Sequence, residues 1–234
     1  MEVFSLLILA LESSAKPASA AVFSDDGRLL GQYYQNSKLT HSKTLLPMVE
    51  ALLKNLDITI SDIGIVAVSR GPGSFTGVRI GVSTAKGLAW GAGIPVCGVS
   101  TLEAMAYQTP EQDVIVCPVM DARRSQVYNA LFEWRNGKPA RLCGDRAISL
   151  EDLSIELKGY SPTYLLVGDG AAISYEFLSA AGVSCRIAPE LMRFQTAYGV
   201  ALAAVNAKSV PAVELEPSYL RPSQAELSFL TPNP

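Results

Sequence analysis

The chain has 234 residues, of which 49% are hydrophobic and 18% are charged. A chain of this length and composition can bury a sizeable core. The formal net charge is −3, which argues against a protein that binds nucleic acid by itself, because such proteins usually present a basic face. The cysteines form no C-x-x-C pair and His41 is the single histidine, so a zinc site of ordinary ligand spacing is excluded.

The N-terminal segment predicts a buried strand rather than an export signal. The apolar run over residues 6–11 is short, and Glu2 precedes it instead of a lysine or arginine. A signal peptide begins with a positively charged region and continues with a longer apolar one. No run approaches the length of a membrane span. We therefore expect a cytoplasmic protein that makes no contact with a membrane.

The next segment predicts a hairpin. Residues 18–35 hold an Asp-Asp-Gly turn between two apolar runs, a pattern typical of two antiparallel strands. Together with the first strand, this gives three antiparallel strands at the start of the chain.

Residues 40–58 predict the first helix. Thr40 or Ser42 can cap it, because a side-chain oxygen there accepts from the free amides of the first turn. Leu46 and Leu53 lie off the main apolar stripe of this helix. Its apolar surface is therefore wider than one contact with a sheet requires.

The rest of the chain alternates strands and helices twice, which indicates an α/β protein with two related subdomains. In the first half, strands are expected at residues 63–69 and 94–100 and helices at 75–90 and 100–108. In the second half, a hairpin is expected around residues 121–124, a strand, glycine turn and helix over 164–182, and an alanine-rich helix over 196–208. We divide the chain into a first subdomain 1–105, a smaller second subdomain 106–195, a late helix 196–210 that packs back on the first subdomain, and an extended tail 211–234.

The glycine-rich stretch AVSRGPGSFTGVRIG, residues 67–81, joins a predicted strand to a predicted helix. A phosphate-binding P-loop is excluded because no Gly-Lys-Ser/Thr sequence ends it, and its match to a dinucleotide-binding turn is weak. Gly77, Gly81 and Ala85 recur one helical turn apart, so they form a strip of small residues. Because glycine lowers helix stability by about 1 kcal/mol relative to alanine, we expect this strip to admit a second backbone, that of a partner helix.

Three motifs carry a resemblance to a known family: SRGPGSFTGVRIG at 69–81, LLPMVEALL at 45–53 and MDARRSQVY at 120–128. They occur in an order similar to that of the TsaB family, also called YeaZ, and the similarity extends from LALESS to EPSYLR. The resemblance implies an actin-like, sugar-kinase-like ATPase (ASKHA) fold with two related subdomains. It also implies a role in making threonylcarbamoyladenosine (t6A) beside the anticodon of tRNA.

The ASKHA fold holds ATP between three loops, and the resemblance locates their counterparts in this chain. The candidate residues are Glu12, Ser13 and Ser14 in the first phosphate loop, Asp121 and Arg123 in the second, and Gly168, Asp169 and Gly170 in the adenosine loop. The first loop lacks glycine and Asp169 adds charge where the nucleotide would lie. We therefore expect a degenerate ATP site and no cofactor bound by this chain alone.

The catalytic relative of the family, TsaD, binds a metal through a His-x-Glu-Gly-His pattern. The matching stretch of this chain keeps Glu103 but has Thr101 and Met105 at the histidine positions, and neither is a good ligand for a hard metal. His41 lies elsewhere and is expected to border a helix. No metal site is therefore predicted in this chain, and ATP and metal are left to its partners.

The resemblance implies a non-catalytic subunit that works with a TsaD-like catalytic subunit and a TsaE-like ATPase, and that meets tRNA only within their complex. The first helix and the glycine-strip helix would form the pairing surface, and the same helices could support a homodimer. The residues expected at this surface are Leu46, Leu53, Gly77, Arg79, Gly81 and Ala85. Two alternatives remain: an independent ATPase or small-molecule kinase using Asp121, and, least favoured, a metallopeptidase.

Overall fold

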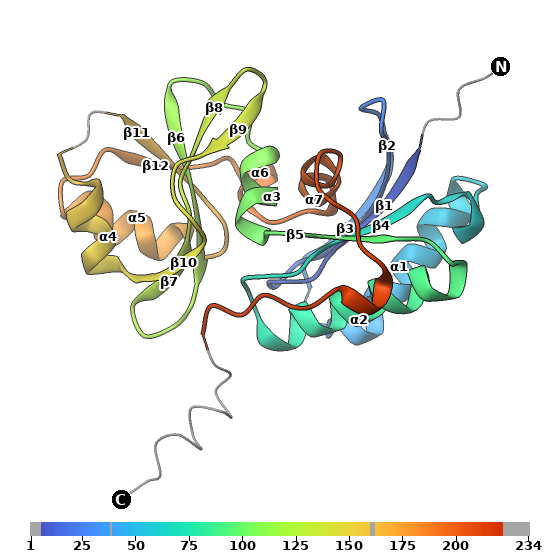
Figure 1. The fold of residues 1–234 in the computed structure, drawn as a ribbon. Coiled ribbons are helices and arrows are strands. Elements are labelled where there is room, and N and C mark those ends of the chain that lie inside the picture. The colour runs from blue at the N-terminus through green and yellow to red at the C-terminus, as the bar shows by residue number, and fades with distance from the viewer. Residues whose placement is uncertain (1–5, 38, 160–161, 222–234) are drawn as a thin grey trace, which may run out of the picture.

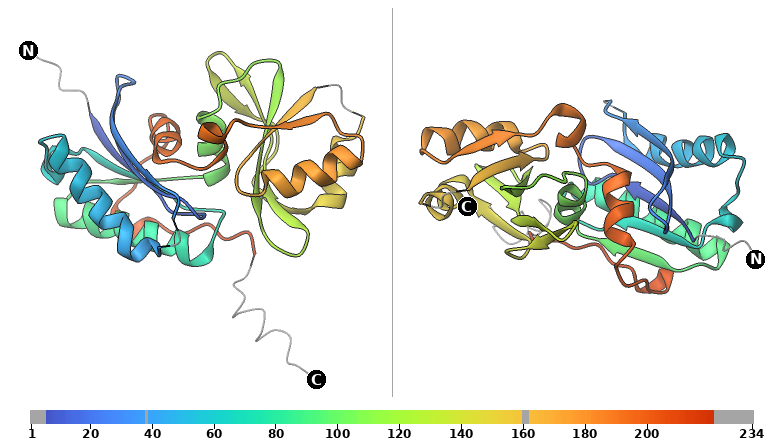
Figure 2. Two further views of the ribbon diagram at one scale, coloured as in Figure 1. Left: turned by 180° about the vertical axis from the view of Figure 1, so that it is seen from behind. Right: turned by 90° about the horizontal axis from the view of Figure 1, so that it is seen from above.

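The computed structural model describes residues 6–37, 39–159 and 162–221. These residues form two α/β lobes, each built around one mixed β-sheet (Figure 1). The first lobe holds the N-terminal strands and the second the middle of the chain. Two helices, α3 (Thr101–Tyr107) and α7 (Ala197–Ala204), lie between the two sheets (Figures 1 and 2).

The first sheet has five strands in the order β3-β2-β1-β4-β5. Its strands are β1 (Leu7–Glu12), β2 (Ala18–Ser24), β3 (Leu29–Gln35), β4 (Ile65–Ser69) and β5 (Val96–Val99). The first three pair antiparallel, as predicted, and the last two add in parallel on the other side of β1. Parallel pairs need crossover connections, and the two long helices supply them.

Those helices, α1 (His41–Asn55) and α2 (Phe75–Ala92), cover one face of the first sheet. The predicted apolar stripe of α1 is buried there, with Leu45 and Leu52 almost fully enclosed. Thr40 directly precedes α1, but its side chain accepts no capping hydrogen bond from the described residues. The other face is covered by α3 and α7, whose small apolar side chains share a core with β1 and β5.

The second sheet repeats the first, with the strand order β10-β7-β6-β11-β12. Its strands are β6 (Val114–Asp121), β7 (Gln126–Asn129), β10 (Arg146–Ser149), β11 (Thr163–Val167) and β12 (Cys185–Ile187). As in the first sheet, three strands pair antiparallel and two add in parallel. The prediction of two related subdomains is therefore confirmed.

The second lobe also contains elements beyond those expected. A hairpin of β8 (Phe132–Arg135) and β9 (Lys138–Arg141) pairs with β6. Helix α4 (Leu150–Leu157), also not expected, shares one core with the sheet and with α5 (Ala171–Ala180), which confirms the helix predicted within residues 164–182. The short α6 (Glu190–Arg193) precedes the return of the chain to the first lobe.

After α7 the chain does not leave the fold. Val210 forms a bridge with Val96, the first residue of β5. The 3-10 turns of the described residues are η1 (Ile60–Asp62), before β4, and η2 (Ala212–Glu214), after this bridge. From η2 the chain passes α2 and runs as an extended segment toward the second lobe (Figure 1). Within the described residues, helices capable of spanning a bilayer are absent.

Candidate functional site in the cleft between the lobes

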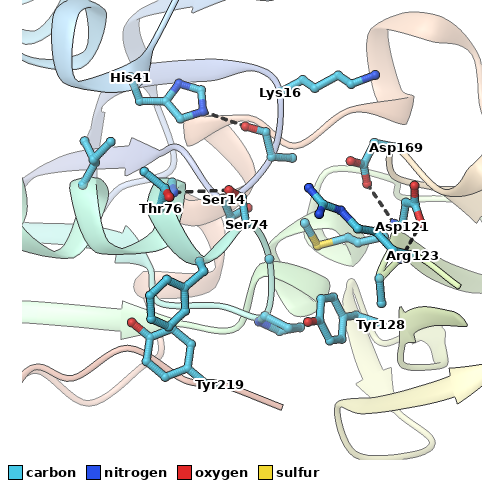
Figure 3. A pocket seen from close by; sticks show the side chains of 18 of the residues that line it. Ser14, Lys16, His41, Ser74, Thr76, Asp121, Arg123, Tyr128, Asp169 and Tyr219 are labelled. Carbon is cyan, nitrogen blue, oxygen red and sulfur yellow. Dashed lines mark hydrogen bonds between the residues drawn. The ribbon is translucent and has the colours of Figure 1, made fainter. Parts of the chain in front are cut away.

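A cavity of about 840 Å³ opens between the two lobes. Its walls come from the β1–β2 turn, the N-terminus of α2, the β6–β7 turn and the extended segment 218–221. Four of the eight residues expected in nucleotide loops line it: Ser14, Asp121, Arg123 and Asp169. The structure thus brings the three predicted loops to one place (Figure 3). Glu12, Ser13, Gly168 and Gly170 do not line the cavity.

The first loop is organised around a buried carboxyl group. Glu12 ends β1 and is fully buried. Its Oε1 accepts a hydrogen bond of 2.6 Å from the Ser14 amide, and its Oε2 accepts one from the Ser69 hydroxyl. Burial raises the pKa of Glu12, although these donors and the nearby His41 counteract the rise. The side chain of Glu12 therefore takes the backbone donor that a phosphate would use in this loop.

The glycine turn before α2 packs on the same loop. The Ser74 amide donates to the Ser14 carbonyl oxygen at 2.6 Å, and the Gly77 amide donates to the Ser74 hydroxyl at 3.3 Å. A Cβ atom on Gly77 would lie 2.1 Å from the carbonyl oxygen of Ser13. Free amides at the start of a helix attract an anion. Two amides at the start of α2, those of Ser74 and Gly77, instead donate to oxygen atoms of the chain itself.

The second and third loops are also held together by a close approach at a glycine and by hydrogen bonds within the chain. A Cβ on Gly168, where φ is +111°, would lie 2.1 Å from the Val119 carbonyl oxygen, so only glycine fits there. Asp169 accepts a hydrogen bond from the Asp121 amide at 3.3 Å, and Asp121 in turn accepts one from the Arg123 amide at 2.7 Å. Burial raises the pKa of Asp169, and the neighbouring Asp121 charge adds to the rise.

His41 is the first residue of α1, where the sequence predicted that it would border a helix. Its Nε2 lies 2.7 Å from the Ala15 carbonyl oxygen, so this nitrogen donates and carries a proton. Its Nδ1 has no hydrogen-bond partner among the described residues. The ring therefore joins α1 to the first loop at the edge of the cavity.

The positions that the resemblance matched to metal ligands do not line the cavity. Thr101 and Met105 on α3 are fully buried. Glu103 on the same helix forms an ion pair of 3.0 Å with Arg141 of β9. The described residues contain no group of three or more His, Cys, Asp or Glu side chains that could hold a metal ion.

The structure corrects the expected partner surface. Gly77, Gly81 and Ala85 are buried against the chain's own first lobe. A Cβ on Gly81 would lie 2.5 Å from the Ser13 hydroxyl, so the close backbone approach that the strip predicted is intramolecular. The expectation that this strip meets a partner helix is therefore wrong.

The other residues expected at that surface differ in how far they are exposed to solvent. Leu53 is half-buried and packs against the first core. Leu46 and Arg79 are exposed, and Trp90, which the sequence reasoning did not select, has 72% of its surface exposed on α2.

Sequence reasoning also missed the role of the segment before the tail. Tyr219 stacks on Phe75 with ring centroids 4.8 Å apart. The Arg79 Nε donates to the Tyr219 hydroxyl at 2.9 Å. Arg221 then crosses to the second lobe and donates to the Ala122 carbonyl oxygen at 2.8 Å. The motif EPSYLR is part of the family resemblance, and the sequence predicted an extended tail over residues 211–234, of which 222–234 lie outside the described residues. The link from α2 to the second lobe was not predicted.

Comparisons with known proteins agree with the resemblance. The family model described as "TsaD: tRNA N6-adenosine threonylcarbamoyltransferase" matches residues 30–228. The chain is 30% identical over 226 residues to the tRNA threonylcarbamoyladenosine biosynthesis protein TsaB of Bacillus subtilis, with 96% of this chain and 98% of that protein covered. It is 31% identical to TsaB of Haemophilus influenzae, with 93% and 94% covered.

Solved structures give the same result. A Pseudomonas aeruginosa protein described as similar to peptidase YEAZ is 27% identical, with a TM-score of 0.80 and 92% of this chain and 100% of that chain covered. The structure named YeaZ from the same organism is 25% identical, with a TM-score of 0.74 and the same coverage. The chain has the ASKHA fold and belongs to the TsaB (YeaZ) family.

Proposed function

We propose that this protein is a non-catalytic subunit in the formation of t6A. With a TsaD-like catalytic subunit and a TsaE-like ATPase, it would support transfer of a threonylcarbamoyl group to N6 of the adenosine beside the tRNA anticodon. The names of its full-length relatives support a role in t6A biosynthesis. We place this work in the cytoplasm, where the tRNA substrate is found.

The main observation in favour of a non-catalytic role is the hydrogen bond that the Ser14 amide donates to Glu12. Phosphoryl transfer relies on preorganised donors aimed at the phosphate oxygens. Here the chain's own carboxylate takes such a donor, and the Ser74 amide at the start of α2 donates to the Ser14 carbonyl oxygen. These loops do not fit an ATP held by backbone amides, so we assign ATP and metal to the partner subunits.

The exposed face of α1 and α2 is the surface that we propose for pairing. It presents Leu46, Arg79 and Trp90, and tryptophan and arginine are the residue types most enriched among interface hot spots. A homodimer through the same helices is the alternative use of this face.

Co-purification with the TsaD-like protein of the same organism tests this proposal. Truncation of a hot-spot residue costs about 2 kcal/mol or more, so Trp90→Ala should weaken pairing more than about tenfold. Ile155→Ala, a matched change at a residue of α4 that is 67% exposed, should leave pairing unchanged. A pair that tolerates Trp90→Ala places the interface elsewhere. A chain that does not associate with the TsaD-like protein at all contradicts the proposed role.

An independent ATPase or kinase remains the second candidate. It is favoured by the size of the cavity and by the presence of Asp121 and Asp169 in its lining. A metallopeptidase is the least supported function, because the buried Thr101 and Met105 occupy the positions expected for metal ligands. We propose that the chain holds no metal of its own. Elemental analysis that finds one zinc or iron per chain after dialysis would contradict this.

A further inference from the structure

The cavity has a charge opposite to that of the whole chain. Its lining contains four positively charged residues, Lys16, Arg123, Arg124 and Arg221, but only two carboxylates, Asp121 and Asp169. Even with both carboxylates ionised, the lining has a surplus of two positive charges, whereas the chain has a net charge of −3. A cleft lined by one sign of charge concentrates ligands of the opposite sign.

These positive charges come from three separate segments that meet across the cleft. Lys16 projects from the β1–β2 turn and Arg123 from the β6–β7 turn (Figure 3). Arg124 follows in the same turn, and Arg221 belongs to the extended segment 218–221. Lys16, Arg123 and Arg124 are exposed. The β6–β7 turn holds both arginines in the left-handed region, with φ of 63° and 55°, a conformation that non-glycine residues rarely adopt and that is often found at functional sites.

Aromatic rings lie among these charges. Phe75, Tyr128 and Tyr219 also line the cavity, and Tyr219 keeps 42% of its surface exposed while it stacks on Phe75. A positively charged groove with exposed aromatic rings is the combination by which proteins hold unpaired nucleic acid, since cations contact the phosphates and rings stack on the bases.

The position of the charges favours a ligand at the rim of the cavity over one in its loops. The loop amides of Ser14 and Ser74 have partners within the chain, and the Asp121 and Asp169 carboxylates repel a phosphate placed between the two phosphate loops. The long side chains of Lys16 and Arg124 extend from the loops at the rim and are exposed. A polymer backbone that follows the rim fits this arrangement better than a nucleotide in the loops.

We propose that this cleft is an RNA contact of the protein. Lys16, Arg123 and Arg124 would bind backbone phosphates of the tRNA, with the exposed Tyr219 ring beside them. The proposal rests on the proposed function, because it concerns tRNA bound by the complex with the TsaD-like subunit. It adds the residues of this chain that touch the RNA.

The test compares two triple variants in that complex. The first, Lys16→Gln, Arg123→Gln and Arg124→Gln, removes the rim charges. The control, Lys138→Gln, Lys158→Gln and Lys208→Gln, removes as many charges from exposed residues outside the cavity. Thermal unfolding of both variants checks that they fold. The affinity of each complex for tRNA is then measured at several salt concentrations.

We expect the rim variant to bind tRNA roughly tenfold more weakly or worse, and the control to bind like the wild type. The slope of log affinity against log salt should become shallower by about 0.7 for each phosphate that the variant no longer neutralises, so by about two for the three substitutions. If the wild-type complex binds tRNA and the rim variant binds it equally well, the RNA contact is refuted while the proposed function stands.

Two further outcomes separate the remaining explanations. If the wild-type complex does not bind tRNA, the proposed function itself fails and the RNA contact fails with it. A second measurement titrates ATP into the isolated chain, once as the wild type and once as the rim variant. Binding of ATP that disappears in the rim variant, with tRNA affinity unchanged, would identify a free nucleotide as the ligand of the cleft and overturn the RNA contact.

Discussion

At the scale of single residues, Glu12 is the group that most distinguishes this cleft from a nucleotide site. Its carboxyl group is fully buried between the first loop and β4, where it accepts from the Ser14 amide and the Ser69 hydroxyl. A carboxyl group supplied by the chain accepts these hydrogen bonds in place of a ligand. The loop is therefore complete in the free protein, which suits a structural role.

The raised pKa of Glu12 gives a pH prediction. Because burial raises this pKa, the folded chain binds the proton more tightly than the unfolded chain, so stability from this group falls as pH rises. The melting temperature of the wild type, minus that of Glu12→Gln, should decrease as pH rises above ~4.3, the ordinary value for glutamate. A difference that grows with pH would show that the hydrogen bonds to the carboxylate outweigh its burial.

At the scale of elements, α2 has two faces with different tasks. Gly77 and Gly81 lie on the inner face against the first loop, whereas Gly87 lies on the outer face with none of the described atoms within 4 Å of an added Cβ. The same residue type therefore serves close packing on one face and leaves space on the other.

Matched alanine substitutions should separate the two faces. Gly77→Ala places a Cβ 2.1 Å from the Ser13 carbonyl oxygen, and overpacking of this kind costs about 1–3 kcal/mol. Gly87→Ala meets no described atom and should gain up to about 1 kcal/mol of helix stability. Thermal unfolding should show a lower melting temperature for the first variant and an equal or higher one for the second. Equal losses in both would contradict the assignment of the faces.

The segment after η2 is a second element with a definite task. Loss of an aromatic pair costs about 0.5–1.5 kcal/mol beyond the buried area, so Tyr219→Ala should release Phe75 and Arg79. We expect a lower melting temperature and faster amide exchange at the start of α2. Tyr219→Phe keeps the ring and should retain most of the protection. Unchanged exchange in Tyr219→Ala would show that the segment only rests on α2.

The sequence predicted most elements but only part of the site. Periodicity and the Asp-Asp-Gly turn identified the first sheet, because each of these signals is local. The β8–β9 hairpin carries a local signal too, Asn136-Gly137, with both residues at positive φ, and the prediction overlooked it. The strip at Gly77 was correctly predicted to admit a second backbone. Which backbone fills it depends on tertiary contacts, which one sequence does not reveal.

At the scale of the whole molecule, the loops of both lobes meet at one cleft, but their polar groups mainly bind one another. We therefore expect the isolated protein to show no useful ATP hydrolysis. A steady-state assay with magnesium checks this. Turnover that disappears in Asp121→Ala, a residue that lines the cavity, would contradict the non-catalytic role and favour the ATPase or kinase.

Reconstituted tRNA modification tests the central claim most directly. The TsaD-like and TsaE-like proteins of the same organism are supplied with tRNA, ATP and an activated threonylcarbamoyl donor, with and without this chain, and t6A in the tRNA is measured. Our account predicts t6A only when the chain is present with both partners, and none from the chain alone. Equal t6A formation without the chain, or formation by the chain alone, would contradict it.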